Sequence, residues 1–219
     1  MKKIIILICL VAFGFAGNYR AVPMDKAQMV QKGASKMFCN VCGMTLPMFY
    51  KTNHAAKIGG EDHQYCSIHC MFEEAMKKGV DVTDPRVIDN STMKFMDATK
   101  AYYVVGSNKP GTMTMVSKYA FGTKNAAEKF AKKYAGKVMI YNEVATLVKK
   151  NLKKEITGIK KKQAKMAMMG KKIYNKMCKM SDKRFNSPAV AKTYIIQSKI
   201  CGNLKGKKLQ AVALYLSGK

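Results

Sequence analysis

Apolar residues in the first part of the chain change from an extended to a helical spacing. We expect a strand over 47–58 and a second, short strand over 63–67. A helix should follow, because Ser67 can cap its start and Gly79 can end it. One side of this helix is apolar and carries Ile68, Met71, Phe72 and Met76. The pattern therefore predicts a strand–strand–helix unit.

The same order of elements recurs further along the chain. Residues 101–107 are β-branched and aromatic, and we expect residues 112–122 to pair with them as a hairpin. Thr123 can cap a second helix that ends at Gly136, and residues 137–141 predict another strand. The apolar positions of this helix are Ala127, Phe130, Ala131 and Tyr134. The repetition predicts an α+β fold built from two small strand–strand–helix units.

The N-terminal residues 1–17 have the pattern of a secretory signal peptide. Two lysines precede an apolar run of about 14 residues, which is short for a membrane span of about 20 residues, and the small residues Gly14 and Ala16 near its end suit signal cleavage. Cys9 lies inside the apolar run and does not predict lipid attachment. We expect an exported, periplasmic protein, with an uncleaved N-terminal anchor as the alternative.

Composition divides the rest of the chain. Residues 18–36 are polar, with few apolar positions in register, and we expect a flexible leader. The two units form a body over 37–147. Residues 148–170 are rich in lysine and methionine, as is typical of a solvated helix or a linker. Two helical patterns within 171–219 predict a small all-α C-terminal domain, which at this size needs a staple.

The chain is strongly basic, with a formal net charge of +27. Only three of its 40 basic residues are arginine, namely Arg20, Arg86 and Arg184. Nucleic-acid sites favour arginine, because its guanidinium makes bidentate contacts with guanine and phosphate. We therefore expect no nucleic-acid partner. A lysine excess is compatible with contact to an anionic membrane surface.

No group of residues predicts catalysis. The three histidines, His54, His63 and His69, do not stand beside an evident nucleophile. Glu73 and Glu74 fall in the first predicted helix, where an acidic pair is typical of the solvated side. The chain contains no glycine-rich phosphate loop. The sequence therefore favours a binding protein over an enzyme.

Four cysteines form two closely spaced pairs. Cys39 and Cys42 are followed, after 23 residues, by Cys66 and Cys70. Two such pairs can hold one metal ion with four soft ligands, which is more specific than a single CxxC. Cys66 and Cys70 lie at the start of the predicted helix, where the helix dipole favours the thiolate that binds metal. His69 lies in the same turn and could add an imidazole.

Nearby methionines bear on the identity of the metal. Four thiolates fit zinc or iron, but Met44 adds a soft thioether that Cu(I) accepts and hard ions do not. Met113 and Met115 are two positions apart, and we expect them on one face of the strand predicted over 112–122. The chain has 18 methionines, so burial in the core is the alternative for each of these. The donor set favours Cu(I).

Other uses of the cysteines stay open. A thiol–disulfide oxidoreductase would place its CxxC at the start of a helix that follows a strand, and no helical pattern begins at Cys42. A structural zinc module would use the same four thiolates. A structural disulfide is a third alternative, because exported proteins reach an oxidising compartment.

Several stretches of the body resemble the NosL family, whose members are copper-binding accessory proteins of nitrous oxide reductase. The similar stretches are CNVCGM (39–44), GGEDHQYCSIHCMFE (59–73), VTDPRVIDNSTMKFMDATKAYYVVGS (82–107) and AFGTKNAAEKFAKKYAGKVMIYNEV (120–144). They occur in order and cover about half of the chain. The cysteine pairs also resemble the YHS and TRASH metal-binding motifs.

The resemblance implies an exported Cu(I) metallochaperone with the duplicated fold predicted above. Its partner would be the nitrous oxide reductase apoprotein or its maturation machinery, where the copper is needed for a copper–sulfide centre. Cys42 and Met44 match the CGM motif of the family, and Met113 or Met115 falls near a further family methionine. The chain departs from many members because it lacks a lipoprotein signal. It is also richer in cysteine, around His69 in particular.

The last segment resembles a small c-type cytochrome. GKKIYNKMC is similar to the first cytochrome helix and LQAVALYLSG to the last. Haem attachment needs CxxCH, but Cys178 is followed by KMSDK, so we expect no haem. The resemblance implies a haem-free relic, in which Cys178 and Cys201 could form a disulfide. The alternative is a second copper-loading site built from Met177, Cys178 and Met180.

Overall fold

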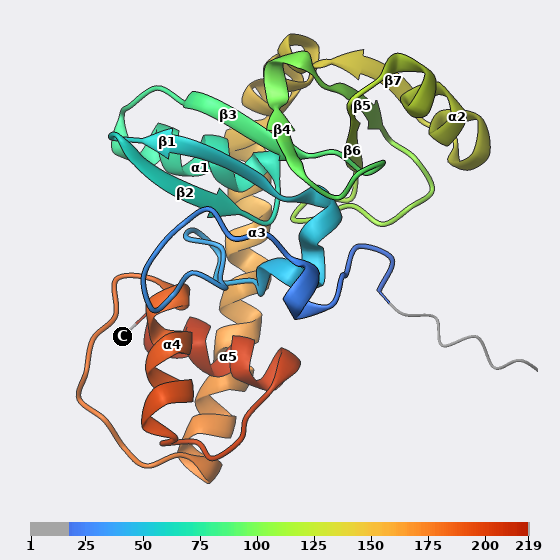
Figure 1. Cartoon of the computed structure of the whole chain (residues 1–219). Coiled ribbons are helices and arrows are strands. Elements are labelled where there is room, and N and C mark those ends of the chain that lie inside the picture. Colours follow the sequence, from blue (N-terminus) through green and yellow to red (C-terminus); the bar gives the residue numbers. More distant parts are fainter. Residues whose placement is uncertain (1–17, 219) are drawn as a thin grey trace, which may run out of the picture.

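The structure of the chain, a computed structural model, describes residues 18–218 and combines two small β-sheets with helices (Figure 1). The signal peptide predicted for 1–17 lies outside these residues. Both sheets lie in the body, and the last helices form a separate layer beside it. The predicted α+β class, with sheets followed by C-terminal helices, is confirmed.

The first sheet has four antiparallel strands in the order β2-β1-β3-β4. β1 (His54–Ile58) and β2 (Glu61–Tyr65) pair as a hairpin, and β2 begins and ends two residues before the strand predicted over 63–67. β3 (Thr83–Ile88) and β4 (Phe95–Asp97) add two strands that the pattern does not predict. Pro85 lies inside β3 and lowers the strand signal of that stretch, because proline cannot donate to a sheet.

The stretch before β1 differs from the prediction. Leu46–Thr52 form a 3₁₀-helix, η2, so the strand expected from residue 47 begins only at His54. Pro47 lies in the first turn of η2, where its missing N–H is not needed. The prediction of a strand over the whole of 47–58 is therefore wrong.

Helix α1 (Ile68–Lys78) occupies the range that the sequence predicts. Ser67 is extended at its N-terminal end, and Gly79 ends it in a left-handed conformation with φ of +65°. A residue with a side chain is disfavoured at such a position, which explains the glycine. Ile68, Met71 and Phe72 on the apolar side of α1 are buried, whereas Met76 near its C-terminal end is 42% exposed. α1 therefore fixes the region around residue 70 against the sheet.

The second sheet has three antiparallel strands in the order β6-β5-β7. They are β5 (Tyr102–Val105), β6 (Lys118–Phe121) and β7 (Lys137–Ile140). Helix α2 (Lys124–Tyr134) packs beside them, and the Thr123 hydroxyl accepts a hydrogen bond from the Ala126 N–H at its start. A short 3₁₀-helix, η3 (Ala98–Lys100), precedes β5.

The hairpin partner of β5 is shorter than predicted. Residues 112–116 form a loop, and only Lys118–Phe121 pair with β5. Met113 has a φ of +66°, which no strand adopts. The expectation that Met113 and Met115 share one strand face is therefore wrong, and both residues lie in the loop.

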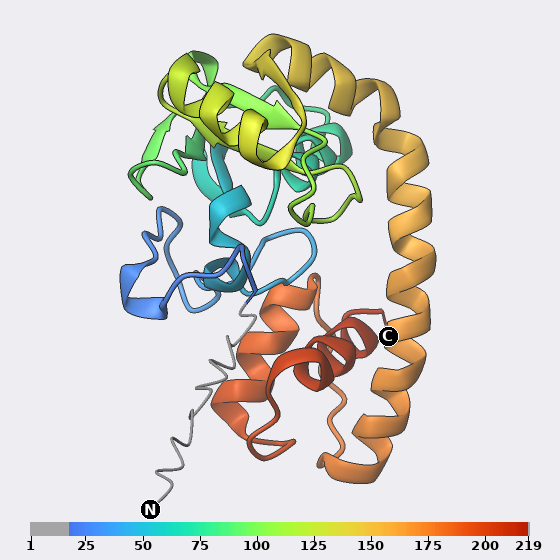
Figure 2. The same cartoon turned by 90° about the vertical axis from the view of Figure 1, so that its right-hand side faces the viewer.

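Helix α3 (Tyr141–Met177) is 37 residues long and connects the body to the end of the chain. Figure 2 shows it running along one side of both parts. Residues 148–170, expected to form a solvated helix or a linker, lie inside it. Lysine, leucine, methionine and alanine are good helix formers, so the stretch has no breaker except two glycines. Every fourth residue of its first half packs on the body: Val144, Val148, Leu152 and Ile156.

The second half of α3 packs with α4 (Pro188–Ser198) and α5 (Gly206–Leu216), and we call these elements the C-terminal unit. At Gly170 a Cβ would lie 2.0 Å from the Ala211 carbonyl oxygen, so α3 and α5 cross closely there. α4 is not among the two helices expected in this segment. It packs on α5 and also contacts the body through Pro188 and Lys192, and its apolar residues do not form a single stripe.

Residues 18–36, for which we expect a flexible leader, pack along the body. They include a short 3₁₀-helix, η1 (Met24–Lys26). The Val30 N–H donates to Gln64 Oε1 at 2.9 Å, and the Gln64 N–H donates to Gln31 Oε1 at 2.8 Å. Gln31 is itself buried. These hydrogen bonds join the segment to β2.

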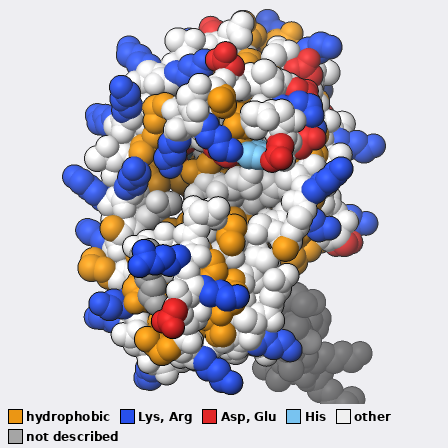
Figure 3. Space-filling view, turned by 90° about the vertical axis from the view of Figure 1, so that its left-hand side faces the viewer, with side chains coloured by type: hydrophobic (Ala, Val, Ile, Leu, Met, Phe, Trp, Pro, Cys, Tyr) orange, Lys and Arg blue, Asp and Glu red, His pale blue; other side chains and the backbone are white. Residues whose placement is uncertain are grey.

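Lysine and arginine side chains are spread over both parts of the face in Figure 3 rather than gathered in one patch. The helices within residues 18–218 are all too short or too polar to cross a membrane.

Candidate metal centre

The four cysteines of the two predicted pairs converge on one point. The sulfur atoms of Cys39, Cys42, Cys66 and Cys70 all lie within 4.8 Å of one another. The Cys42 and Cys66 sulfurs are 3.5 Å apart, and the Cys66 and Cys70 sulfurs are 3.8 Å apart. None of these four is joined in a disulfide.

A tight turn presents the first pair. The Cys39 N–H donates to the Met44 carbonyl at 2.9 Å, and the Gly43 N–H donates to the Cys39 carbonyl at 2.8 Å. Gly43 has a φ of +69°, which lets the chain reverse directly after Cys42. The sulfurs of Cys39 and Cys42 are thereby held on the same side of the turn.

The second pair comes from the junction between β2 and α1. Cys66 directly follows β2, and Cys70 lies in the first turn of α1. The Thr52 hydroxyl donates to the Cys66 carbonyl at 2.8 Å, which ties this junction to η2. A strand end and a helix start thus bring the two sulfurs of this pair to the first pair.

The thiols are buried, with exposed fractions of 0–1%. A metal carrier needs ligands that a partner can reach, and none of these sulfurs is directly exposed. Burial raises the pKa of the Cys39 thiol, but hydrogen bonds from the other three thiols outweigh it and hold that pKa well below its usual range. Burial and the hydrogen bond with Cys39 raise the pKa of Cys66, and the bond with Cys39 also raises that of Cys70. A cation is needed before all four can be thiolates.

The geometry fits a soft metal ion. Four sulfurs at about 2.3 Å from one tetrahedral ion are about 3.8 Å apart, and the two short separations above lie near that value. Thiolates select Cu(I), zinc and iron–sulfur clusters over hard ions. The arrangement can therefore hold one soft ion in a site that its own backbone already shapes.

His69 does not join the sulfurs. Its Nδ1 lies 3.0 Å from Glu155 Oε2, and its Nε2 lies 3.4 Å from Glu73 Oε2. Glu155 comes from α3 and Glu73 from α1. The imidazole, proposed above as an additional ligand, therefore links two helices through carboxylates, and the described cluster of metal-binding side chains contains only cysteines.

The predicted methionines lie beside the cysteine cluster. Met44, Met113 and Met115 line one cavity of about 310 Å³, which Cys42 also lines. Met115 is 88% exposed and stands at its edge, whereas Met44 and Met113 are partly buried against the core. The cavity offers thioethers between solvent and one of the four thiols.

Other walls of this cavity come from outside the body. Met166 in α3 adds a fourth thioether, and Gln210 in α5 lies beside Cys42. The Gln210 side-chain amide donates to the Cys42 carbonyl at 2.8 Å. Sequence reasoning missed both residues. The cluster of methionines around residue 166 was a compositional signal, but nothing local relates it to residue 42.

Lys192 is a further residue that sequence reasoning missed. It lies in α4, and its Nζ donates to the Gly43 carbonyl at 2.6 Å. Burial lowers the pKa of Lys192 to about 8, against the opposing influence of Cys42, Cys39 and Cys66. One lysine in such a lysine-rich chain carries no sequence signal, so only the packing of α4 identifies it.

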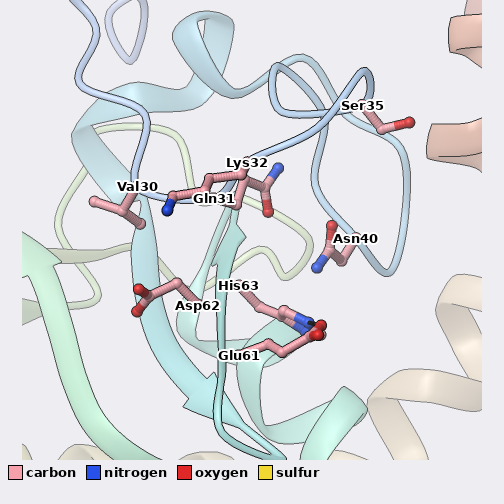
Figure 4. A pocket seen from close by; sticks show the side chains of 8 residues that line it. All are labelled: Val30, Gln31, Lys32, Ser35, Asn40, Glu61, Asp62 and His63. Carbon is pink, nitrogen blue, oxygen red and sulfur yellow. Dashed lines mark ion pairs between the residues drawn. The ribbon is translucent and has the colours of Figure 1, made fainter.

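A separate cavity of about 370 Å³ lies beside β2 and the segment 30–40 (Figure 4). Polar side chains line it, among them Gln31, Asn40, Glu61 and His63. In Figure 4 the His63 and Glu61 side chains extend toward each other, and His63 Nδ1 lies 3.0 Å from Glu74 Oε1. No cysteine or methionine lines this cavity, so it is distinct from the metal centre.

The remaining two described cysteines are far along the chain. Cys178 and Cys201, offered above as a disulfide, are joined as one in the structure. Because Cys178 is bonded in this disulfide, it cannot supply the thiolate that the alternative copper-loading site with Met177 and Met180 needs.

Comparisons with known proteins concern mainly the body. A profile of the NosL family matches residues 30–148, which is more than half of the chain. No curated protein sequence matches. A solved structure, described as the crystal structure of the copper chaperone NosL from Shewanella denitrificans, is 24% identical with a TM-score of 0.43. The match covers 55% of this chain and 96% of that one. The family match shows that the chain belongs to the NosL family.

Proposed function

We propose that this protein is a Cu(I) carrier, a copper chaperone without catalytic activity of its own. One observation carries the proposal: four thiols within 4.8 Å of one another adjoin a cavity lined by methionines. Thiolates and thioethers are soft donors, which suit Cu(I) and are poor ligands for hard ions. Membership of the NosL family supports the same function.

The cavity supplies the access that a carrier needs. The thiols are buried, but Cys42 lines the cavity together with Met44, Met113 and Met115. A thioether is uncharged and cannot be protonated at working pH, so it can hold Cu(I) briefly without competing with a proton. Copper would pass from solvent to the methionines, and then to Cys42, by stepwise ligand exchange. Loss to a partner would follow the reverse order.

The proposed destination is the copper–sulfide centre of nitrous oxide reductase, with the apoprotein or its maturation machinery as the partner. Family membership supports this destination. The protein would act after export to the periplasm, and its excess of lysine would suit contact with an anionic membrane surface rather than nucleic acid. The destination is tested by mixing the Cu(I)-loaded protein with metal-free reductase and measuring the copper that the reductase gains.

Titration of the reduced protein with Cu(I) against a competing chelator tests the binding itself. We expect tight uptake by the wild type and a loss of affinity in Cys42→Ser, because Cys42 belongs to both the cluster and the cavity. Met168→Leu is the matched control, since Met168 is exposed and does not line the cavity. Absence of Cu(I) uptake by the wild type contradicts the proposal.

A structural zinc site is the second candidate, and the burial of all four sulfurs favours it. Structural zinc sites are closed and tetrahedral, and removal of the zinc ion unfolds small domains. Metal analysis of protein isolated without chelators separates the two: stoichiometric zinc that resists Cu(I) supports the second candidate. A thiol–disulfide oxidoreductase is less well supported, because neither Cys39 nor Cys42 presents an exposed sulfur to a substrate.

A further inference from the structure

Lys192 is a buried lysine that reaches the turn carrying the first cysteine pair. Its residue is 3% exposed, and its Nζ donates to the Gly43 carbonyl at 2.6 Å. The same ammonium lies 5.0 Å from the centre of the Phe38 ring. Gly43 directly follows Cys42, so a helix of the C-terminal unit places a positive charge beside the metal centre.

This ammonium has no carboxylate partner among the ion pairs of residues 18–218. A buried charge without a counter-charge is strongly unfavourable, so a burial of this kind normally comes with an anion. The groups that favour its charge electrostatically are Cys42, Cys39 and Cys66. The anion that matches Lys192 is therefore the cysteine cluster in its thiolate form.

Neighbouring contacts hold the same turn from the same side. The Gln210 amide donates to the Cys42 carbonyl at 2.8 Å, so two consecutive carbonyls accept hydrogen bonds from the C-terminal unit. A Cβ at Gly43 would lie 2.8 Å from Pro188 Cβ, which shows how closely α4 approaches. Lys192, Gln210 and Pro188 all lie beyond residues 30–148, the range of the family match.

We propose that Lys192 is a positioning residue of the metal centre: its ammonium balances the negative charge of the metal-bound thiolates and fixes the turn that carries Cys39 and Cys42. The C-terminal unit is thus part of the site rather than an appendage. The proposal rests on the proposed metal-binding function and adds to it the source of charge compensation. A monovalent ion on several thiolates leaves a net negative charge, so compensation favours the loaded state in a buried site.

Metal affinity of three variants tests the role of this charge. Lys192→Gln keeps a hydrogen-bond donor for Gly43 but removes the charge, and Lys192→Arg keeps the charge. Residues that support metal ligands from outside commonly change affinity by about 10–100-fold. We expect Lys192→Gln to lose Cu(I) affinity within that range, with Lys192→Arg closer to the wild type, both measured against a competing chelator.

Two controls separate charge from structure. Lys207→Gln changes the net charge by the same amount at an exposed position of α5, and its affinity should stay at the wild-type value. Gln210→Ala removes the other carbonyl contact without altering charge, and its loss should be smaller than that of Lys192→Gln. Near-ultraviolet circular dichroism and thermal unfolding of each metal-free variant report whether the C-terminal unit still packs.

The outcomes are distinct. Unchanged affinity in a folded Lys192→Gln overturns the proposal, and so does an equal loss in Gln210→Ala, which would leave only a structural clamp. If Lys192→Gln no longer packs, the Cu(I) affinities of Lys192→Arg and Gln210→Ala are compared instead. Lys192→Arg, which keeps the charge, must then bind Cu(I) more tightly than Gln210→Ala. Repeating the series with Co(II), whose thiolate charge-transfer band reports binding, separates a failure of the Lys192 proposal from a failure of the proposed copper function. A wild type that binds Co(II) but not Cu(I) refutes the copper function and still measures the effect of Lys192.

Discussion

The body and the C-terminal unit both contain cysteines, but they use sulfur in opposite ways. In the body, Cys39, Cys42, Cys66 and Cys70 are free thiols that meet from two turns. In the C-terminal unit, one pair of cysteines separated by 23 positions forms a disulfide. The four thiols lie close enough to share a metal ion, yet they are not paired with each other.

The difference follows from what each part of the chain can bury. The body has a core of its own, built from both sheets, α1 and the first half of α3, so it does not depend on a covalent link. The C-terminal unit has fewer than half as many core residues, and a unit of this size gains most from a staple. The cysteines thus stay free to act as ligands where the core is sufficient, and they form a crosslink where it is not.

Loss of one thiol from the body should have the largest effect. Cys66 lies within 4 Å of two other sulfurs, so Cys66→Ser removes a ligand at the middle of the cluster. We expect metal affinity to fall by more than the roughly 100-fold seen for supporting residues, as measured by chelator competition. Cys201→Ser is the matched control, and equal losses in the two variants would break the comparison.

Low pH should have the next largest effect. It should lower the stability of the body in particular, because all three histidines of the chain lie there. His54 is fully buried, its Nε2 is 3.1 Å from the Tyr103 hydroxyl, and burial lowers its pKa to about 3. The unfolded chain takes up a proton near pH 6.5, where the folded chain does not. Stability is therefore complete above pH 6.5 and falls as the pH drops, by about 3 kcal/mol at pH 4.

Denaturant unfolding at pH 7 and pH 4 measures this slope. His54→Gln should flatten it, whatever the variant costs at neutral pH. Tyr103→Phe is the control, since it removes the hydrogen-bond partner of His54 Nε2 but keeps the buried imidazole. A slope that persists in His54→Gln would show that another group drives acid unfolding.

Removal of the disulfide should affect the C-terminal unit. Closing a loop of 23 residues stabilises a fold by about 3 kcal/mol in the chain-entropy account. The double variant Cys178→Ala, Cys201→Ala should therefore unfold its C-terminal unit at lower denaturant, and it should still bind one equivalent of metal. Loss of metal stoichiometry in the double variant would mean that the disulfide, too, supports the centre.

The smallest effect is expected where the two parts touch. Gly43→Ala places a Cβ at a positive φ, at a cost of about 1–2 kcal/mol, and brings it within 2.8 Å of Pro188 Cβ. Gly59→Ala is the matched control, because Gly59 has a similar φ of +63° with nothing within 4 Å of its Cβ position. Thermal unfolding should show a larger loss of stability for Gly43→Ala than for Gly59→Ala. Equal losses would mean that α4 can move away from residue 43 without destabilising the fold.

Local patterns predicted the regular elements well where one side of an element is apolar. α1 and α2 begin and end close to the predicted positions, with Gly79 and Thr123 in the predicted roles, whereas Ser67 precedes α1 without a capping hydrogen bond from its side chain. The patterns failed where packing or proline interrupts them. Pro47 begins a 3₁₀-helix inside a predicted strand, and α4 has no single apolar face because it touches two neighbours.

The sequence by itself determined the two cysteine pairs, their soft-donor chemistry and the repeated strand–strand–helix order, because each of these depends on neighbours a few positions apart. Only the tertiary structure decided that the four sulfurs meet, that His69 turns away to Glu155, and that Lys192 lies beside Gly43. The last contact joins residues 149 positions apart. Such contacts depend on how whole elements pack, and no local spacing encodes them.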